Sequence, residues 1–460
     1  MKVVVTGGSG QLGTLVLRRL VASRKVKRIV SLDLQPPAVQ SPKLDWKIAD
    51  VRDPGLDRHL EGASALVHLA FIVTRRATAE LMHAVNVEGS QRMFEYAAAQ
   101  GVGRIVYSSS IAAYGVVPGQ PVPIVEETPR QRSPLRYADN KYEVEQWLDA
   151  FEEHHPDLAL VRLRPAILIG RRMPHALGDA MRRGVMPSFG TARLPIVWDE
   201  DVADAVLLAL MADARGAFNL SADELLDAAD LARAGGMRVV RLRTSAFGGA
   251  LRLSPVLERL GVASSFDPAW LDAADIEVVV SSERALSELG WKPRCPTAAS
   301  VMQRYVAEAP RRLDPRIRVF LRMVAAAGRA APSSQIPPEA RRLDLGLHLD
   351  ITGPSGGDVA LEVNRGRPRL ARGIPRPPDA VIELSARTFL ELLSGRQDLS
   401  SAQLSGKVKV RGEPVAGFVL AGMITAFARR RNDTGPGGWT ARRLSHWFER
   451  GLGSGPEDVS

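Results

Sequence analysis

Short apolar runs rich in β-branched residues alternate with helix-spaced segments over the first 170 residues. Five such runs predict strands: Val3–Val5, Ile29–Leu32, Ala65–Leu69, Ile105–Tyr107 and Ala159–Leu163. Between them apolar residues recur at helical spacing, as in Leu12, Leu15, Val16 and Leu20, and in Met93, Phe94, Ala97 and Ala98. Nearly continuous apolar strands separated by helices are typical of a parallel sheet covered on both faces. The pattern predicts an α/β fold with a doubly wound parallel sheet.

The pattern loosens from about residue 170 to 309, where the connections are rich in proline and a late strand is predicted at Ile276–Val280. We interpret this stretch as a small substrate lobe of the same unit, so that the first domain covers 1–309. Residues 310–338, punctuated by Arg and Pro, predict a linker helix.

A different pattern follows the linker. Apolar residues alternate strictly with polar ones at Leu343, Leu345, Leu347, Leu349 and Ile351, at Val359, Leu361 and Val363, and then at Val381 with Glu383. Strict alternation predicts half-buried antiparallel strands. Phe389, Leu390 and Leu393, and Phe418, Val419, Gly422, Met423 and Phe427, have helical spacing. We therefore expect a separate α+β domain over 339–431, with a start near residue 313 as the alternative.

The last residues, 432–460, predict a flexible joint and a short basic amphipathic helix, with Trp439, Leu444, Trp447 and Phe448 on its apolar side. Such a helix either docks back on its own protein or lies on a membrane surface.

Composition narrows the class of protein. A chain of 460 residues with 45% hydrophobic and 24% charged residues is typical of two or three soluble globular domains. Its single cysteine, Cys295, excludes an internal disulfide and fits a reducing compartment. The longest apolar stretch, Ala416–Ala428, is too short to span a bilayer. A strand starts directly after Met1 where a signal peptide would lie, so we expect a cytoplasmic protein.

The net charge of +10 is unevenly divided. Residues 311–460 hold 24 basic and 15 acidic residues, which leaves the first 310 residues almost neutral. Because the charge belongs to the C-terminal part alone, it supports a domain boundary and does not indicate a nucleic-acid partner. The Arg-rich surface could attract phosphates or anionic lipid headgroups, or could be ordinary solvation.

A glycine-rich turn follows the first predicted strand. Thr6-Gly7-Gly8-Ser9-Gly10-Gln11-Leu12-Gly13 leads directly into a predicted helix. Glycines let the chain turn tightly and let backbone N–H groups approach a pyrophosphate at a helix N-terminus. Asp33 ends the next strand, where a carboxylate can hold both ribose hydroxyls and would repel a 2′-phosphate. This arrangement favours NAD over NADP. Asp50, after the expected third strand, could accept a hydrogen bond from an adenine amino group.

A second constellation carries reaction chemistry. Ser108-Ser109-Ser110 follows the strand Ile105–Tyr107, and Tyr137 and Lys141 lie four residues apart on a predicted helix, so both face the same way. A lysine ammonium beside a phenol favours the phenolate and lowers the pKa of the tyrosine. Tyr137 could then take the proton of a substrate hydroxyl while a hydride passes to a nicotinamide ring. Eight scattered histidines and one cysteine predict no metal site.

With these motifs in view, residues 1 to about 308 resemble the extended short-chain dehydrogenase/reductase family, the NAD-dependent epimerase/dehydratases, which have a Rossmann-type sheet. The motifs that carry the resemblance are Thr6 to Gly13, Asp33, Asp50 to Asp53, His68 to Ala70, Asn86 to Ser90, Tyr107 to Ser110 with Tyr114-Gly115, Tyr137 to Lys141, Arg162 to Pro165, Asp201 to Ala205 and Leu289 to Pro293. The nearest branch is UDP-glucose 4-epimerase-like. Phe71 stands where many members carry a second alanine, which leaves the substrate open.

The resemblance implies a set of site residues. Catalysis would use Ser110, with Ser109 as the alternative, Tyr137 and Lys141. NAD would be bound by Gly7, Gly10, Gln11, Leu12, Gly13, Asp33, Asp50, Val51, Leu69, Ala70, Tyr137 and Lys141.

Residues from about 313 to 431 resemble the sterol-carrier-protein lipid-transfer domain. The resemblance rests on Asp379 to Ser385, Phe389 to Gly395 and Leu404 to Gly412. It implies an apolar tunnel for an acyl chain or a sterol, although apolar stripes on strands and helices are more often plain core.

Together these features favour an NAD-dependent oxidoreductase or epimerase acting on a secondary alcohol, either a nucleotide sugar or a lipid or sterol alcohol. A non-catalytic NAD sensor that carries lipid, and lipid delivery as the main activity, are the alternatives. A homodimer and a peripheral membrane contact stay open as further partners.

Overall fold

The computed structural model describes residues 1–73, 77–171, 173, 176–182, 184–188, 192–241, 276–308, 313–330, 340–352, 357–371, 378–413 and 415–431. The predicted tail helix lies outside the described residues. The chain divides into two compact units, 1–305 and 306–460, and each is described by itself.

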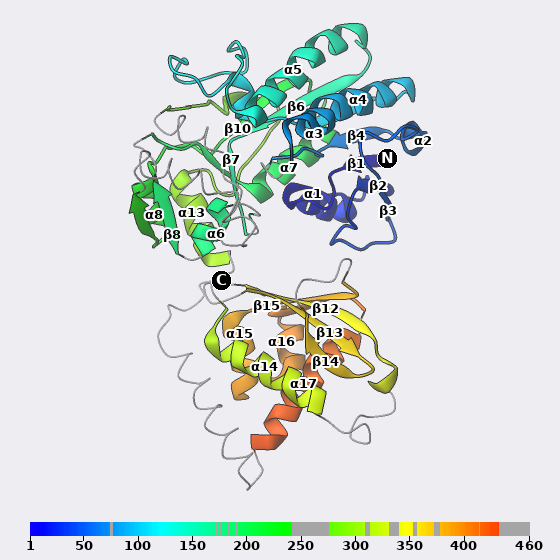
Figure 1. Cartoon of the computed structure of the whole chain (residues 1–460), viewed down its shortest axis with the longest axis vertical. Coiled ribbons are helices and arrows are strands. Elements are labelled where there is room, and N and C mark those ends of the chain that lie inside the picture. The colour runs from blue at the N-terminus through cyan, green and yellow to red at the C-terminus, as the bar shows by residue number, and fades with distance from the viewer. Residues whose placement is uncertain are drawn as a thin grey trace. The chain divides into compact units, whose positions relative to one another are not determined.

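The first unit is built on a seven-stranded sheet in the order β10-β6-β5-β4-β1-β2-β3 (Figure 1). Its strands are β1 (Lys2–Thr6), β2 (Arg28–Asp33), β3 (Leu44–Ile48), β4 (Ala65–His68), β5 (Arg104–Ser108), β6 (Ala159–Pro165) and β10 (Gly216–Leu220). Every neighbouring pair is parallel. The α/β prediction and its five strands are confirmed.

Helices cover both faces of this sheet. They are α1 (Gln11–Ala22), α2 (Asp57–Leu60), α3 (Ala79–His83), the π-helix η1 (Ala84–Glu88), α4 (Gly89–Ala99), the 3-10 helix η2 (Ile111–Tyr114), α5 (Arg136–His154) and α7 (Asp199–Met211). Strand residues alternate between the faces: Val3 and Val5 pack with α1 and α7, whereas Val4 packs with α4 and α5. Parallel pairing with helical crossovers brings all strand carboxyl ends to one edge.

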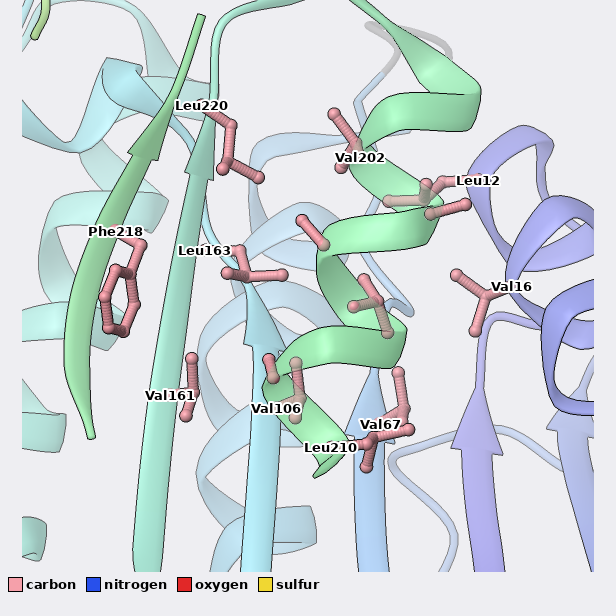
Figure 2. Packing of buried hydrophobic residues seen from close by; sticks show 14 of the residues in the cluster. Leu12, Val16, Val67, Val106, Val161, Leu163, Val202, Leu210, Phe218 and Leu220 are labelled. Carbon is pink, nitrogen blue, oxygen red and sulfur yellow. The ribbon is translucent and has the colours of Figure 1, made fainter. Parts of the chain in front are cut away.

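The core under α7 shows how tightly this layer is packed. Figure 2 shows Leu210 at one end of α7 beside Val67 of β4, with Val202 toward the other end of the helix, and both helix residues are buried in one cluster with Val67 and Val106 of β5. Burying a side chain of this size stabilises a fold by about 1.5–3 kcal/mol. The strands that end at the carboxyl edge of the sheet are therefore backed by a closely packed core.

The rest of the first unit comprises short elements. These are β7 (Ile167–Ile169), α6 (Ala176–Arg182), β8 (Val185–Ser188), β9 (Ile196–Trp198), α8 (Ala228–Ala234), β11 (Arg238–Arg241), α12 (Glu283–Ser287) and α13 (Ala298–Glu308). The late strand predicted at Ile276–Val280 is wrong: this segment forms a single bridge, between Val280 and Ile124.

The second unit has a five-stranded sheet in the order β14-β13-β12-β15-β16, with helices packed on one face (Figure 1). Its elements are α14 (Pro315–Ala330), η4 (Ala340–Arg342), β12 (Leu345–Thr352), β13 (Gly357–Asn364), β14 (Arg367–Leu370), β15 (Ala380–Ser385), α15 (Ala386–Ser394), α16 (Leu399–Leu404), β16 (Val408–Gly412) and α17 (Val415–Arg431). The α+β prediction is confirmed. Within the segment expected to be a linker helix, α14 contributes Ile317, Phe320 and Leu321 to this core.

Two details of the second sheet differ from the expectation. The pairing of β12 with β15 is parallel, with β13 and β14 between them along the chain, whereas the other neighbours are antiparallel. On β15, Ile382 and Leu384 face the core, so Val381 and Glu383 lie on the other face. Among the described residues, no helix is long and apolar enough to cross a bilayer.

Candidate active site

The glycine-rich turn joins β1 to α1 at the carboxyl edge of the sheet. Gly7 has φ of +74°, and a Cβ there would lie 2.6 Å from the backbone nitrogen of Ala70. A Cβ on Gly13 would lie 2.1 Å from the Gly7 oxygen. Both positions therefore exclude any side chain. Helix α1 begins behind Gly10 with no acidic residue in its first turn, so its N-terminal N–H groups and dipole can receive an anion.

The acidic residue expected to hold the ribose lies beside this turn. Asp33 ends β2, and its carboxylate accepts hydrogen bonds from the backbone N–H groups of Ser9 (2.9 Å) and Gln35 (3.2 Å). These bonds fix the carboxylate beside the glycine-rich turn, at the place where the adenosine ribose of a bound dinucleotide is expected.

The other residues expected to contact the dinucleotide lie around the same edge of the sheet, and their side chains have different partners. Asp50 is paired with Arg52 at 2.7 Å, and the hydrogen bond from Arg52 holds the pKa of Asp50 below its ordinary value. The Gln11 amide donates to Asp199 at 2.8 Å. Leu12 and Val51 are buried in the core, so these two could contact a dinucleotide only through their backbones. Leu69 and Ala70 follow β4, directly beside Gly7.

The three serines after β5 have distinct partners. Ser110 caps η2, accepting from the N–H of Ala112 at 3.1 Å, and its hydroxyl lies close enough to Tyr137 to lower the pKa of that phenol. Ser109 donates to the buried carboxylate of Glu145. The carbonyl oxygen of Ser108 accepts a hydrogen bond from the Lys141 ammonium. The structure therefore brings Ser110, and not Ser109, to the tyrosine.

Lys141 is buried and is held by β5. Its ammonium donates to the Ser108 carbonyl oxygen at 2.7 Å and to the Tyr107 hydroxyl at 3.1 Å. It also lies 3.5 Å from the centroid of the Phe71 ring and 6.0 Å from that of the Tyr137 ring. The tyrosine and the lysine thus face the same site from one face of α5, as their spacing predicts.

The expected lowering of the tyrosine pKa is not found in this arrangement. Burial raises the pKa of Tyr137, and the hydrogen bond with Ser110 opposes that rise only in part. Burial also lowers the pKa of Lys141 well below its ordinary value, against the attraction of Glu145. The physical reason is that the hydrogen bonds of the ammonium go to Tyr107 and Ser108 while both groups are shielded from water.

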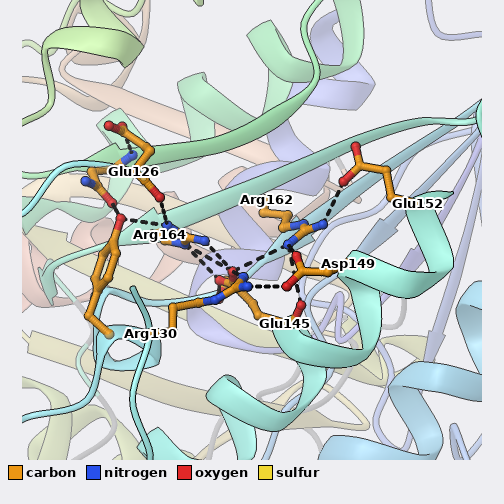
Figure 3. Close-up of polar contacts among 10 residues, drawn as sticks. Glu126, Arg130, Glu145, Asp149, Glu152, Arg162 and Arg164 are labelled. Atoms are coloured by element: carbon orange, nitrogen blue, oxygen red, sulfur yellow. Dashed lines mark hydrogen bonds and ion pairs between the residues drawn. The ribbon is translucent and has the colours of Figure 1, made fainter. Parts of the chain in front are cut away.

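A buried ion network beneath the site was not predicted from the sequence. Figure 3 shows Glu145 of α5 among the guanidinium groups of Arg130, Arg162 and Arg164. Arg164 also donates to the Tyr114 hydroxyl at 2.6 Å. Burial alone would raise the pKa of Glu145, but these arginines lower it to about 2. Two signals were present: Glu145 follows Lys141 at helical spacing, and Arg162 and Arg164 interrupt an apolar strand.

A buried histidine ties the strand ends together. His68 of β4 is hydrogen-bonded through Nδ1 to the Thr6 hydroxyl at 2.8 Å and through Nε2 to the Ser90 hydroxyl at 2.9 Å. Burial, with the nearby charge of Lys141, lowers the pKa of His68 to about 3. The histidine therefore stays neutral and connects the end of β1, with its glycine-rich turn, to α4.

In the second unit, the structure shows polar features that the sequence did not indicate. A cavity of about 560 Å³ lies where β15 meets α15, and its lining includes Glu383, Lys407 and Lys409. This lining differs from the apolar tunnel that the resemblance implies. His348, Asp350 and Asp358 bring their ligand atoms within 4.8 Å of one another, and His348 contacts Asp358 at 2.8 Å.

Comparison with known proteins places each unit. Residues 3–221 match the model of the NAD dependent epimerase/dehydratase family, and residues 326–423 match that of the SCP-2 sterol transfer family. An uncharacterized protein of Mycobacterium tuberculosis is 25% identical over 307 residues, which are 64% of this chain and 81% of that protein.

Two further similarities cover parts of the chain. Sterol demethylase protein B of Methylococcus capsulatus is 32% identical over 121 residues, which are 26% of this chain and 37% of that protein. The structure of the dTDP-glucose 4,6-dehydratase DesIV from Streptomyces venezuelae, solved with NAD and TYD bound, has a TM-score of 0.53 at 21% identity. That likeness covers 66% of this chain and 95% of the dehydratase, and it supports the fold alone.

Proposed function

Because residues 3–221 belong to the NAD dependent epimerase/dehydratase family and residues 326–423 to the SCP-2 sterol transfer family, we propose that this enzyme oxidises or epimerises a secondary alcohol of a lipid or sterol. The observation that carries the proposal is that Tyr137 and the buried Lys141 share one face of α5, with 6.0 Å between the ammonium and the centroid of the phenol ring. Ser110 acts on the same phenol, because it lowers the pKa of Tyr137. A hydroxyl to hold the substrate oxygen, a phenol to exchange a proton and an ammonium to stabilise negative charge thus lie together at the carboxyl edge of the sheet.

The dinucleotide site fits NAD on the residues present. Gly7 and Gly13 leave no room for a side chain, and Asp33 is held in place by two backbone N–H groups. When bound, NAD would accept a hydride from the substrate carbon and, in an epimerase, return it. Asp33 would bind the ribose hydroxyls and repel a 2′-phosphate, which favours NAD over NADP.

The chain's own residues would move the proton. Ser110 would hold the substrate oxygen next to the Tyr137 hydroxyl, and Tyr137 would take the proton of the alcohol as general base. Tyr137 would act as its phenolate, which Lys141 would stabilise through its charge until the proton transfer makes it a neutral phenol. Burial keeps water from both groups, so the electrostatic interaction between them is stronger than it would be in solvent.

The lipid or sterol class of substrate is supported by the second unit. A domain of the SCP-2 sterol transfer family on the same chain would present an apolar molecule to the first unit, and one relative carries the name sterol demethylase protein B. A nucleotide sugar, the substrate class of the resembling epimerase branch, is the competing class.

The test gives the full chain NAD and either a 3-hydroxysterol dispersed in cyclodextrin or UDP-glucose. It measures NADH formation for net oxidation and the chromatographically separated epimer for epimerisation. We expect turnover of the sterol, and a loss of about two to four orders of magnitude in Tyr137→Phe. Tyr142→Phe, on the same helix, is the matched control and should keep its rate. Equal rates in Tyr137→Phe and the wild type would reject Tyr137 as the general base. Binding of NAD with no turnover of either substrate would support the non-catalytic NAD-sensing alternative, and turnover of UDP-glucose alone would reject the sterol class.

A further inference from the structure

The ammonium of Lys141 has three N–H donors, and the structure gives each of them a neighbour. Two are taken by the Ser108 carbonyl oxygen at 2.7 Å and the Tyr107 hydroxyl at 3.1 Å. The Phe71 ring centroid lies 3.5 Å from the same nitrogen. A cation within about 6 Å of an aromatic face is attracted by the ring quadrupole, and the attraction grows when the cation is shielded from water. The face of Phe71 is thus the nearest ring face to the ammonium, since the centroids of the Tyr107 and Tyr137 rings lie at 4.6 Å and 6.0 Å.

Phe71 is held in this place by its backbone neighbour. The side-chain amide of Asn86, buried in the π-helix η1, accepts from the N–H of Ile72 at 2.6 Å and donates to its carbonyl oxygen at 3.0 Å. The ring itself packs edge-to-face on Tyr137, with 5.6 Å between centroids and 87° between planes. One side chain therefore contacts both members of the Tyr137–Lys141 pair.

We propose that Phe71 is the positioning residue of Lys141: its ring face completes the ammonium's shell, and so keeps the side chain charged and aimed beside Tyr137. An alanine at this position would leave the third N–H facing an apolar gap. The aromatic ring is thus a functional part of this chain's site, and its departure from the family pattern is not merely a change of pocket shape. The inference rests on the role proposed above for Lys141.

The charge balance around the ammonium explains why such a contact is needed. Burial lowers the pKa of Lys141, and Glu145, one turn further along α5, opposes this from beyond the hydrogen-bonding distance. The other titratable groups facing it are Tyr137 on α5, Tyr107 on β5 and His68 on β4. The pKa of Tyr107 is raised well above its ordinary value by burial, and His68 is neutral, so neither supplies a negative charge at neutral pH.

The test measures Lys141 directly and needs no substrate. The chain has nine lysines, so carbon-13 labelling at lysine Cε gives a tractable NMR spectrum of the full chain, in which Lys141→Arg identifies the resonance. We expect the pKa of Lys141 to fall by about one unit in Phe71→Leu, which removes the π face at similar volume. Phe71→Tyr, which keeps the ring, should leave it unchanged, as should Val73→Ala, a neighbouring exposed control.

Phe71→Met is a second variant without a π face, and we expect the same fall in the Lys141 pKa there. It keeps the test possible if Phe71→Leu does not fold. If both variants fold and keep the wild-type pKa at Lys141, the proposal is wrong. A shift of equal size in Phe71→Tyr would also overturn it, because packing alone would then be responsible. These readouts do not involve turnover. Failure of the proposed reaction would therefore be seen separately, as the absence of both NADH and epimer formation with the pKa shift intact.

Discussion

Arg164 of β6 and Glu145 of α5 form a buried pair in which the arginine Nε lies 2.9 Å from one carboxylate oxygen and 3.2 Å from the other. Both side chains are shielded from solvent. Because Glu145 also accepts from Ser109, the pair joins the helix that carries Tyr137 and Lys141 to the segment that carries Ser110. The geometry of the candidate site therefore depends on a carboxylate that is fully shielded from solvent.

Replacing Glu145 with glutamine should destabilise the first unit strongly. The change leaves Arg130, Arg162 and Arg164 without their shared buried carboxylate, and removing one partner of a buried ion pair costs about 3–5 kcal/mol. Urea unfolding of the full chain, followed by tryptophan fluorescence, measures this cost. Glu143→Gln is the matched control, since Glu143 is partly exposed and paired only with His83, and it should cost less than about 1 kcal/mol.

The same carboxylate predicts a pH dependence. Its folded pKa of about 2 is below the ordinary value of 4.5, so its stabilisation is complete above about pH 4.5 and is lost as the pH falls toward 2. The unfolding free energy of the wild type should therefore fall in this window, and the fall should be smaller in Glu145→Gln. Parallel curves for the two proteins would contradict the assignment.

His68 predicts a pH dependence in a different window. Its folded pKa of about 3 is below the ordinary value of 6.5, so the unfolded chain binds a proton that the folded chain does not. The unfolding free energy should therefore fall as the pH falls below 6.5, with a contribution of about 1.4 kcal/mol per pH unit. In His68→Gln the slope between pH 6 and 5 should decrease by about this amount, whereas His154→Gln, at an exposed position, should keep the wild-type slope.

The sequence predicts well those elements whose burial is nearly complete. All five predicted strands are found, since each lies inside the sheet or under a helix. For strand β3 the sequence predicted only that a strand precedes Asp50, without its bounds. Leu44 to Ile48 form an edge strand with largely exposed side chains, so few apolar residues mark it in the sequence. The late strand at Ile276–Val280 was predicted wrongly from an apolar run that packs on the core without a ladder.

In the candidate site, the spacing of residues along the chain predicted those relationships that lie within a single helix. Tyr137 and Lys141 share a face because they are four residues apart. The direction of the ammonium could not be predicted, because it is set by Tyr107 and Phe71, which reach the site from two other segments. The choice of Ser110 over Ser109 likewise depends on Glu145, a contact between elements distant in sequence.

Asp33 should govern the choice of dinucleotide. Its carboxylate stands beside the glycine-rich turn, held by the N–H of Ser9, where it would bind ribose hydroxyls and repel a 2′-phosphate. In Asp33→Ser we expect weaker NADH binding and stronger NADPH binding, narrowing the ratio of their dissociation constants by about ten- to a hundredfold. Fluorescence titration of the full chain with each reduced dinucleotide measures the ratio. Asp45→Ser, at a partly exposed position on β3, is the control, and an unchanged ratio in Asp33→Ser would exclude this role.

Alanine substitutions at two glycines of the turn should have different effects on stability and on NADH binding. A Cβ on Gly13 would lie 2.1 Å from the Gly7 oxygen and 2.7 Å from the Gly8 Cα, so Gly13→Ala must displace the turn and should lower both stability and NADH affinity. A Cβ on Gly10 would have only the Gly7 oxygen within 4 Å, at 3.4 Å. Gly10→Ala should therefore unfold at the wild-type urea concentration, while the added methyl group at the helix N-terminus blocks the approach of a pyrophosphate and weakens NADH binding at least tenfold. If Gly10→Ala bound NADH as tightly as the wild type, the pyrophosphate would have to lie elsewhere, and the proposed dinucleotide site would be wrong even with the fold intact.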